Sequence, residues 1–170
     1  MKRLIALLFI ATISSFTMSC NDDDSNGNYV DNDTYSEVYD INNVNFGYDN
    51  NTGYFIKRSF SKPLYNTDMV LIYQNTAVDN GNKVWTLIPR TIYLNDGNEV
   101  DYTFDFTASD VQIYAGATFN LANTEYVTNK SFRVLVIPAA LARSQSTVDF
   151  SDYNAVVKFY NLNDKKVYKL

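Results

Sequence analysis

The chain offers few side chains with which an enzyme could perform catalysis. It contains no histidine and a single cysteine, Cys20. Without histidine, it lacks the Ser-His and Cys-His pairs of nucleophilic catalysis, histidine ligands for zinc and the commonest general base. Its six glycines show neither P-loop spacing nor a Gly-x-Gly pair. We therefore expect a protein that is not an enzyme and that holds no cofactor and no metal ion.

Carboxylate chemistry is the remaining catalytic option. Asp101 and Asp105 alternate with apolar residues and are expected on the solvent-facing side of one strand. At about 3.4 Å per residue, the two carboxylates stand about 13–14 Å apart. Glycoside hydrolases place theirs about 5–9.5 Å apart, so this pair does not suit that reaction. Two carboxylates from different strands would suit it, and a carboxylate-based glycan hydrolase therefore stays open as an alternative.

Two turn sequences, residues 49–53 and 79–82, contain the oxygen ligands that Ca²⁺ prefers. Neither matches an EF-hand loop, which needs more ligands and a later glutamate. The same residue types also form ordinary turns, which is the interpretation we favour. A calcium-dependent adhesion module is the second alternative.

Aromatic residues make up 15% of the chain and would suit a surface on which sugar rings stack. At alternate positions of a strand, however, aromatic residues usually belong to the core. We assign four of them to the core: Trp85, Tyr102, Phe104 and Phe106. The exposure of three further residues depends on strand register: Tyr73, Tyr93 and Tyr114.

The N-terminal residues have the pattern of an export signal. Lys2 and Arg3 precede an apolar run at 4–16 that is thirteen residues long. A membrane-spanning helix needs about 20 such residues, so this run is too short to span a bilayer. A positive start, a short apolar segment and small residues before Cys20 are typical of a secretory signal.

The end of this segment, Thr17-Met18-Ser19-Cys20, resembles the lipobox of bacterial lipoproteins. The resemblance implies that the signal peptide 1–19 is removed and that the Cys20 sulfur carries a lipid that anchors the protein to a membrane. The alternative is a secreted protein whose cysteine happens to lie beside the cleavage site.

An acidic run follows: Asn21, Asp22, Asp23, Asp24 and Ser25. It resembles the surface-export signal of lipoproteins in the Bacteroidota. This resemblance implies a lipid-anchored outer-membrane protein that faces the cell exterior. If the run is only a solvated tether, the protein faces the periplasm instead.

Removal of 1–19 leaves 12 basic and 19 acidic residues, a formal net charge of −7. An acidic protein repels phosphate backbones, so we expect no nucleic-acid partner. Residues 20–37 are rich in Asp, Asn, Ser and Gly and are interpreted as a flexible tether. Residues 38–170 have the length and composition of a single β-rich globular domain.

Strands dominate the first part of this domain. Alternating apolar residues predict a hairpin of 38–48 and 54–60 around the turn at 49–53. Three further strands are expected at 69–77, 84–94 and 99–107, joined as a meander by Asn-Gly and Asp-Gly turns.

The middle strand of the meander contains Pro89, which predicts a bulge because proline cannot donate a ladder hydrogen bond. If the second turn is a two-residue loop, Tyr93 pairs with Val100 and Leu87 with Phe106. Trp85, Leu87 and Tyr93 then join the buried face.

The remaining chain is expected to add strands at 111–115 and 131–138, the latter central because it is almost continuously apolar. A single helical turn is expected at 139–143, a helix at 152–160 and an edge strand within 165–170. Asp149 or Ser151 is the expected helix cap. One apolar stripe of the helix should cover the sheet: Tyr153, Val156, Val157 and Tyr160.

The expected fold is therefore mainly β, an antiparallel β-sandwich-like domain with one short C-terminal helix packed on it. Residues 68–162 also resemble an uncharacterised domain of flavobacterial lipoproteins, on segments such as 84–90 and 132–138. That family carries no established activity. We expect a non-catalytic surface protein that binds a glycan or a protein, or that contributes to envelope structure.

Overall fold

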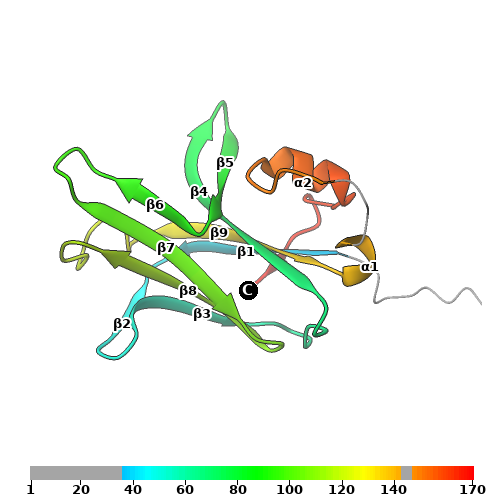
Figure 1. Cartoon of the computed structure of the whole chain (residues 1–170), viewed down its shortest axis with the longest axis horizontal. Helices are drawn as coiled ribbons and strands as arrows, with labels where there is room; N and C mark the ends of the chain where they lie inside the picture. The colour runs from blue at the N-terminus through cyan, green and yellow to red at the C-terminus, as the bar shows by residue number, and fades with distance from the viewer. Residues whose placement is uncertain (1–35, 143–146) are drawn as a thin grey trace, which may run out of the picture. The chain divides into compact units, whose positions relative to one another are not determined.

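The structure, a computed structural model, describes residues 36–142 and 147–170. Within these residues the chain is mainly β, with ten strands and two short helices (Figure 1). The strands form two sheets of five. This confirms the expected β-sandwich-like fold with a short C-terminal helix. The predicted signal peptide, Cys20 and the acidic run from Asn21 to Ser25 lie outside the described residues.

The first sheet, sheet A, has β9 (Lys130–Ile137) at its centre. Its antiparallel neighbours are β1 (Glu37–Val44) and β4 (Met69–Asp79), and β5 (Asn82–Ile88) pairs with the other side of β4. β10 (Tyr168–Lys169) joins the edge of β1 as a parallel strand. The predictions of a central apolar strand and of a C-terminal edge strand are thus confirmed.

The second sheet, sheet B, is antiparallel throughout and has the order β2–β3–β8–β7–β6. Its strands, in that order, are Gly47–Asp49, Gly53–Ser59, Asp110–Ala117, Glu99–Phe106 and Arg90–Tyr93. The chain passes from one sheet to the other several times, because β1, β4, β5 and β9 belong to sheet A and the strands between them belong to sheet B.

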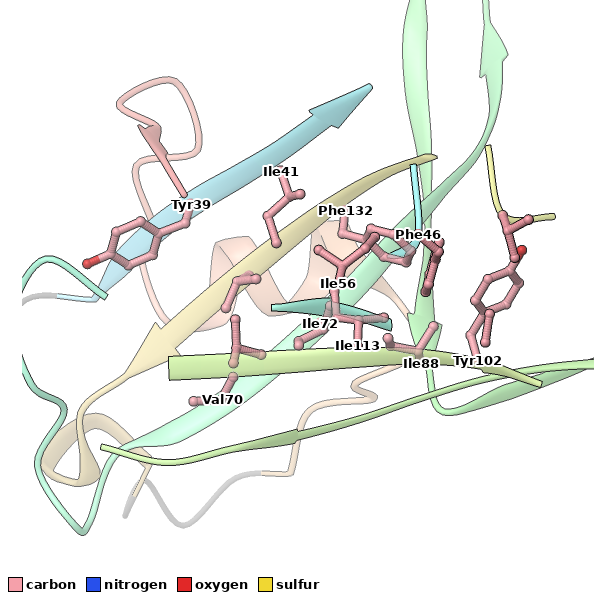
Figure 2. Close-up of a cluster of buried hydrophobic side chains, with 14 of the residues drawn as sticks. Tyr39, Ile41, Phe46, Ile56, Val70, Ile72, Ile88, Tyr102, Ile113 and Phe132 are labelled. Atoms are coloured by element: carbon pink, nitrogen blue, oxygen red, sulfur yellow. The ribbon is translucent and has the colours of Figure 1, made fainter. Parts of the chain in front are cut away.

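The main core lies between the two sheets (Figure 2). Sheet A contributes Ile41, Ile72 and Phe132, and sheet B contributes Tyr102 and Ile113, each at most 1% exposed. These residues alternate along their strands with residues on the outer faces, the pattern of a sheet that is buried on one side.

A second apolar layer covers the outer face of sheet A. There α2 (Tyr153–Phe159) lies over β4 and β9, and its Val156 packs with Tyr73 and Leu135. The predicted cover of the sheet by the helix is therefore confirmed. The single helical turn that the sequence predicts is also present as α1 (Ala139–Ala142).

The helix cap differs from the prediction. Asp152 is the N-cap, and its Oδ1 accepts a hydrogen bond of 3.0 Å from the backbone N–H of Ala155. The assignment of the cap to Asp149 or Ser151 was wrong. Asp149 instead binds the backbone N–H and the hydroxyl of Ser151 within the preceding turn.

The predicted meander is also wrong in one respect. The segment 84–94 does not form one bulged strand, because it leaves sheet A after Ile88 and enters sheet B at Arg90. Pro89 lies at the crossing, where it has no N–H to donate to either ladder. The result is two hairpins in different sheets, β4–β5 and β6–β7.

The first predicted hairpin divides in the same way. The turn at 49–53 is correct, but only the short strand β2 pairs with β3. The residues of β1 pair with β9 in the other sheet, so the stretch 38–48 is not a single strand. Local alternation of apolar residues could not reveal this change of sheet.

The register expected for the second turn was also wrong. Tyr93 pairs with Glu99, and Ile92 pairs with Val100, because the loop is longer than two residues. Tyr93 is therefore exposed, at 75%, rather than buried. Trp85 and Leu87 contribute to the outer layer beneath α2 and not to the core between the sheets.

Candidate functional site

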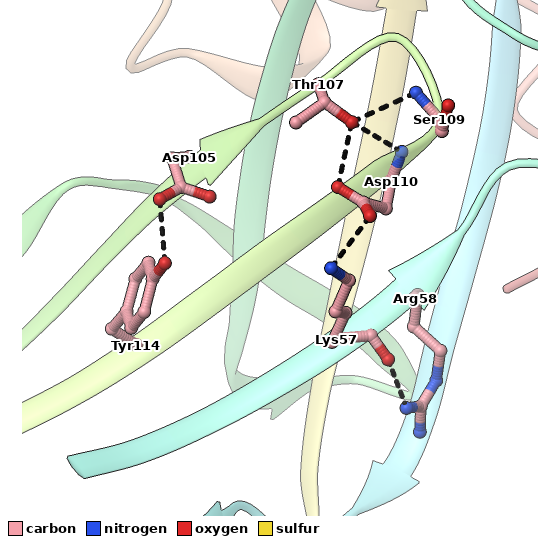
Figure 3. A network of polar contacts seen from close by, with 7 residues as sticks. All are labelled: Lys57, Arg58, Asp105, Thr107, Ser109, Asp110 and Tyr114. Atoms are coloured by element: carbon pink, nitrogen blue, oxygen red, sulfur yellow. Dashed lines mark hydrogen bonds and ion pairs between the residues drawn. The ribbon is translucent and has the colours of Figure 1, made fainter. Parts of the chain in front are cut away.

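The two carboxylates considered for catalysis lie on the outer face of sheet B, as predicted, and are bound separately. The Thr91 hydroxyl donates to Asp101 at 2.6 Å. The Tyr114 hydroxyl donates to Asp105 at 2.7 Å (Figure 3). The bond to Asp105 raises the pKa of Tyr114. Both interactions join neighbouring strands, so these carboxylates act in sheet pairing.

A third carboxylate on sheet B, Asp110, also has structural partners. It accepts a hydrogen bond from the Thr107 hydroxyl and forms an ion pair with Lys57 at 2.9 Å (Figure 3). The hydrogen bond from Lys57 lowers the pKa of Asp110. These contacts close the β7–β8 turn and tie it to β3.

The two loops considered for calcium serve as turns. Asp49 Oδ1 accepts hydrogen bonds from the backbone N–H groups of Asn51 and Thr52. In the β4–β5 turn, Asn80 and Gly81 have φ values of 48° and 83°, as a tight hairpin turn requires. Across residues 36–142 and 147–170, no group of three or more His, Cys, Asp or Glu side chains is placed to hold a metal ion.

A cleft of about 710 Å³ lies between the β4–β5 hairpin and the start of α2. In Figure 1 this hairpin rises beside α2. We call it the Trp85 cleft, because the half-buried Trp85 of β5 lies in its wall. Its other functional side chains are Tyr153, Arg133, Lys83, Asp79, Asp152 and Asp164.

Strand and helix geometry bring these residues together. In β5, Lys83 and Trp85 are two residues apart and therefore point to the same side of the strand, and Trp85 packs in the apolar layer on the outer face of sheet A. The cap at Asp152 starts α2 so that Tyr153 turns back towards the sheet. There the Tyr153 ring lies edge-on to Tyr73, with centroids 5.2 Å apart, and 6.0 Å from Trp85.

Arg133 forms a fixed cationic floor for this cleft. Its Nε and Nη2 donate to the two carboxylate oxygens of Asp40 at 2.7 and 3.0 Å, and its Nη1 donates to the Tyr153 hydroxyl at 2.7 Å. Burial alone would lower the pKa of Arg133, but the bonds to Asp40 and Tyr153 raise it above its usual value. The charged guanidinium lies 4.6 Å from the centre of the Trp85 ring, a cation–π distance.

Tyr153 links this floor to the C-terminal segment. Burial raises the pKa of Tyr153 to about 12, despite the opposing hydrogen bond from Arg133. The phenol is therefore protonated at neutral pH and donates to Asp164 at 3.3 Å. Every hydrogen bond of the Arg133 network thus has a defined direction.

Lys83 is the movable part of the cleft. It is exposed, its Nζ donates to the Asn42 side chain at 2.8 Å, and this Nζ lies 5.3 Å from the centre of the Trp85 ring. A long lysine side chain reorients at little cost at an exposed position. The cleft therefore combines a rigid aromatic and guanidinium surface with an adaptable donor and nearby carboxylates.

The sequence did not identify this site. Trp85 was assigned to the core, but it belongs to the outer layer because β5 lies in sheet A and not against β7. Arg133 was seen only as part of an apolar strand. A charged residue within an apolar strand was the available signal, because a buried arginine requires a partner. The sequence did not show which residue that partner is, because Asp40 lies 93 residues away.

No protein family model, curated protein or solved structure matches this chain. The fold and the geometry of the site therefore carry the functional argument. No helix among the described residues is both long and apolar enough to cross a bilayer. What the structure defines is a β-sandwich-like domain with an aromatic, polar-lined cleft on the outer face of one sheet.

Proposed function

We propose that this protein is a lipid-anchored lipoprotein of the Bacteroidota type that binds a glycan at the cell surface without catalysis. The anchor is Cys20, and the acidic run from Asn21 to Ser25 directs the protein outward. The single observation that supports the glycan is the Trp85 cleft.

The cleft has the size and chemistry that glycan binding needs. Its volume of about 710 Å³ lies within the range of roughly 300–1,000 Å³ typical of ligand sites. An indole face stacks against the apolar face of a sugar ring, whereas Lys83 and the carboxylates of Asp79 and Asp164 suit its hydroxyl groups. The fixed Arg133 network orients the aromatic wall before the ligand arrives, which lowers the entropic cost of binding.

A glycan screen tests this proposal directly. The lipid-free chain, residues 20–170 with Cys20→Ala, is screened against a broad glycan array. Trp85 is the only tryptophan, so a change in its fluorescence reports on this cleft alone. We expect at least one bound glycan to change the emission.

Variants separate the cleft from general surface effects. Trp85→Ala should weaken binding by at least about tenfold, equivalent to about 1.4 kcal/mol. Lys83→Glu changes an exposed side chain of the cleft without removing core packing, and it should also change the affinity for the bound glycan. Tyr93→Ala, which removes an aromatic side chain 75% exposed on sheet B, is the matched control and should have no effect. If no bound glycan alters Trp85 emission, the proposal is wrong.

The same preparation tests the alternatives. Cleavage products after incubation with a bound glycan would favour a carboxylate-based hydrolase over a non-catalytic protein. A melting temperature that rises with Ca²⁺ and falls with a chelator would favour calcium-dependent adhesion. A protein ligand or a structural role in the envelope would remain if the array shows no binding.

Surface protease treatment of intact cells tests the location. Loss of the protein from intact cells, together with release of a Cys20→Ala variant into the medium, is the expected result. Protection from the protease would mean that the protein faces the periplasm and that the acidic run is only a tether.

A further inference from the structure

A second cleft, separate from the Trp85 cleft, lies at one end of sheet B. Its volume is about 590 Å³, and it is bounded by β2, by the start of β3, by β8 and by the loop that follows β8. We call it the Tyr48 cleft. Tyr48 is 62% exposed, and its ring centroid lies 4.9 Å from that of Tyr54.

The lining of the Tyr48 cleft is aromatic and uncharged. Tyr48, Tyr54 and Phe119 line it together with small residues, and no Asp, Glu, Lys or Arg side chain is among the described residues around it. This contrasts with the Trp85 cleft, whose lining carries five charged side chains. A charged ligand would find no counter-charge in the Tyr48 cleft, so the cleft suits a neutral one.

The polar atoms at this site are free to bind a ligand. Within the described part of the chain, the hydroxyls of Tyr48 and Tyr54 have no hydrogen-bond partner. The Asn120 side-chain oxygen already accepts the N–H of Ala122 at 2.9 Å, which leaves its NH₂ group as a donor. Two aromatic faces with hydroxyls at their edges distinguish this cleft from a purely apolar groove.

Gly116 contributes only backbone to this cleft. It lies in β8 between Ala115 and Ala117, which both pack towards the core between the sheets, and it pairs with Asp101. The open space beside its Cα atom therefore lies on the outer face of sheet B, away from Tyr54.

We propose that the Tyr48 cleft is a second binding site, for a neutral saccharide. One sugar ring stacks on the exposed face of Tyr48 and lies close to the backbone at Gly116. The Tyr48 and Tyr54 hydroxyls and the Asn120 amide bind its hydroxyl groups. The site does not depend on the Trp85 cleft, which lies on the outer face of the other sheet.

The test uses the full-length protein, purified in a detergent without a sugar headgroup. Neutral oligosaccharides of glucose, galactose, mannose and xylose are titrated by calorimetry, and Trp85 fluorescence is recorded in parallel. We expect binding of at least one oligosaccharide without a change in Trp85 emission. Binding seen only as a change in Trp85 emission would place the ligand in the other cleft and would overturn the proposal.

Tyr48→Ala should reduce this affinity by at least about tenfold, because it removes the stacking surface. Tyr48→Phe keeps the ring and should lose less affinity. Tyr93→Ala is the matched control, a tyrosine of similar exposure on the same sheet, and should bind as the unaltered protein does. Tyr48 is mostly exposed, so its variants should keep the original melting temperature.

Three further results would overturn the inference. One is that no neutral oligosaccharide binds at millimolar concentration. Another is that binding survives Tyr48→Ala unchanged. The third is that unstructured peptides bind to the Tyr48 cleft and the saccharides do not. None of these results depends on whether the Trp85 cleft binds a glycan, so the two proposals can fail independently of each other.

Discussion

Replacement of Asp40 by alanine should destabilise the protein more than the loss of any exposed ion pair. The Asp40 and Arg133 side chains are only 13% and 11% exposed, and two hydrogen bonds join them. Removal of the carboxylate leaves a mostly buried guanidinium that, among the described residues, keeps a hydrogen bond only to Tyr153. Breaking a buried pair from one side costs roughly 3–5 kcal/mol, and the residual exposure here favours the lower end, about 3 kcal/mol.

Urea unfolding of the lipid-free chain measures this cost. A loss of about 3 kcal/mol lowers the folded-to-unfolded ratio by a factor of about 150. For a domain of this size, it lowers the melting temperature by about 6–12 °C. The m-value should not change, because the surface exposed on unfolding is the same.

Two variants make the result decisive. Lys57→Ala breaks an ion pair with Asp110 in which Lys57 is 52% exposed, and it should cost much less stability because solvent screens the two charges. The double change Asp40→Leu with Arg133→Met should recover most of the lost stability, because no charge is then left buried. If Asp40→Ala costs no more than Lys57→Ala, the argument that Arg133 needs its carboxylate is refuted.

Four further predictions concern single residues. Tyr73→Phe removes a 2.7 Å hydrogen bond to the carbonyl of Phe150 and should cost about 1 kcal/mol in urea unfolding. Burial raises the pKa of Tyr153 to about 12, above its value of about 10 in the unfolded chain. The stability that this shift contributes is therefore complete below about pH 10 and is lost as the pH rises towards about 12. Between pH 9 and 11.5, the free energy of unfolding should therefore fall less for Tyr153→Phe than for the unaltered protein. Asp152→Ala removes the cap of α2 and should cost about 1 kcal/mol in a thermal melt, whereas no change would show that the helix does not depend on this cap. Gly116→Ala should raise the free energy of unfolding by about 0.5 kcal/mol, because the site has ordinary φ and open space, and a decrease would show a hidden constraint.

Sequence reasoning succeeded where structure is set locally. The alternation of Val100 and Tyr102 with polar residues placed the inner face of this part of β7 correctly, since both are fully buried. The spacing of Tyr153 and Val156 likewise predicted which side of α2 faces the sheet. In each case, the face on which a side chain lies follows from its spacing to nearby residues in the same strand or helix. The assignment of Phe106 to the core was wrong, because its side chain is 43% exposed at the end of the strand.

Sequence reasoning failed where the chain changes sheet. The continuous apolar pattern around Pro89 gave no sign that Ile88 and Arg90 belong to different sheets. That outcome depends on pairing with distant strands, which local periodicity does not encode. The Trp85 cleft was missed for the same reason, because it requires β5 to lie beside α2 and not beside β7.

Strand β9 is central in sheet A but late in the sequence, and this combination determines when the growing chain can complete its fold. Phe132 and Val134 enter the core between the sheets, whereas Leu135 and Ile137 support the layer under α2. All other strands of sheet A except β10 are synthesised before this one, so β1 and β4 have no central partner until residue 137 is available. A growing chain therefore stays unfinished through most of its length and completes both layers in one late step.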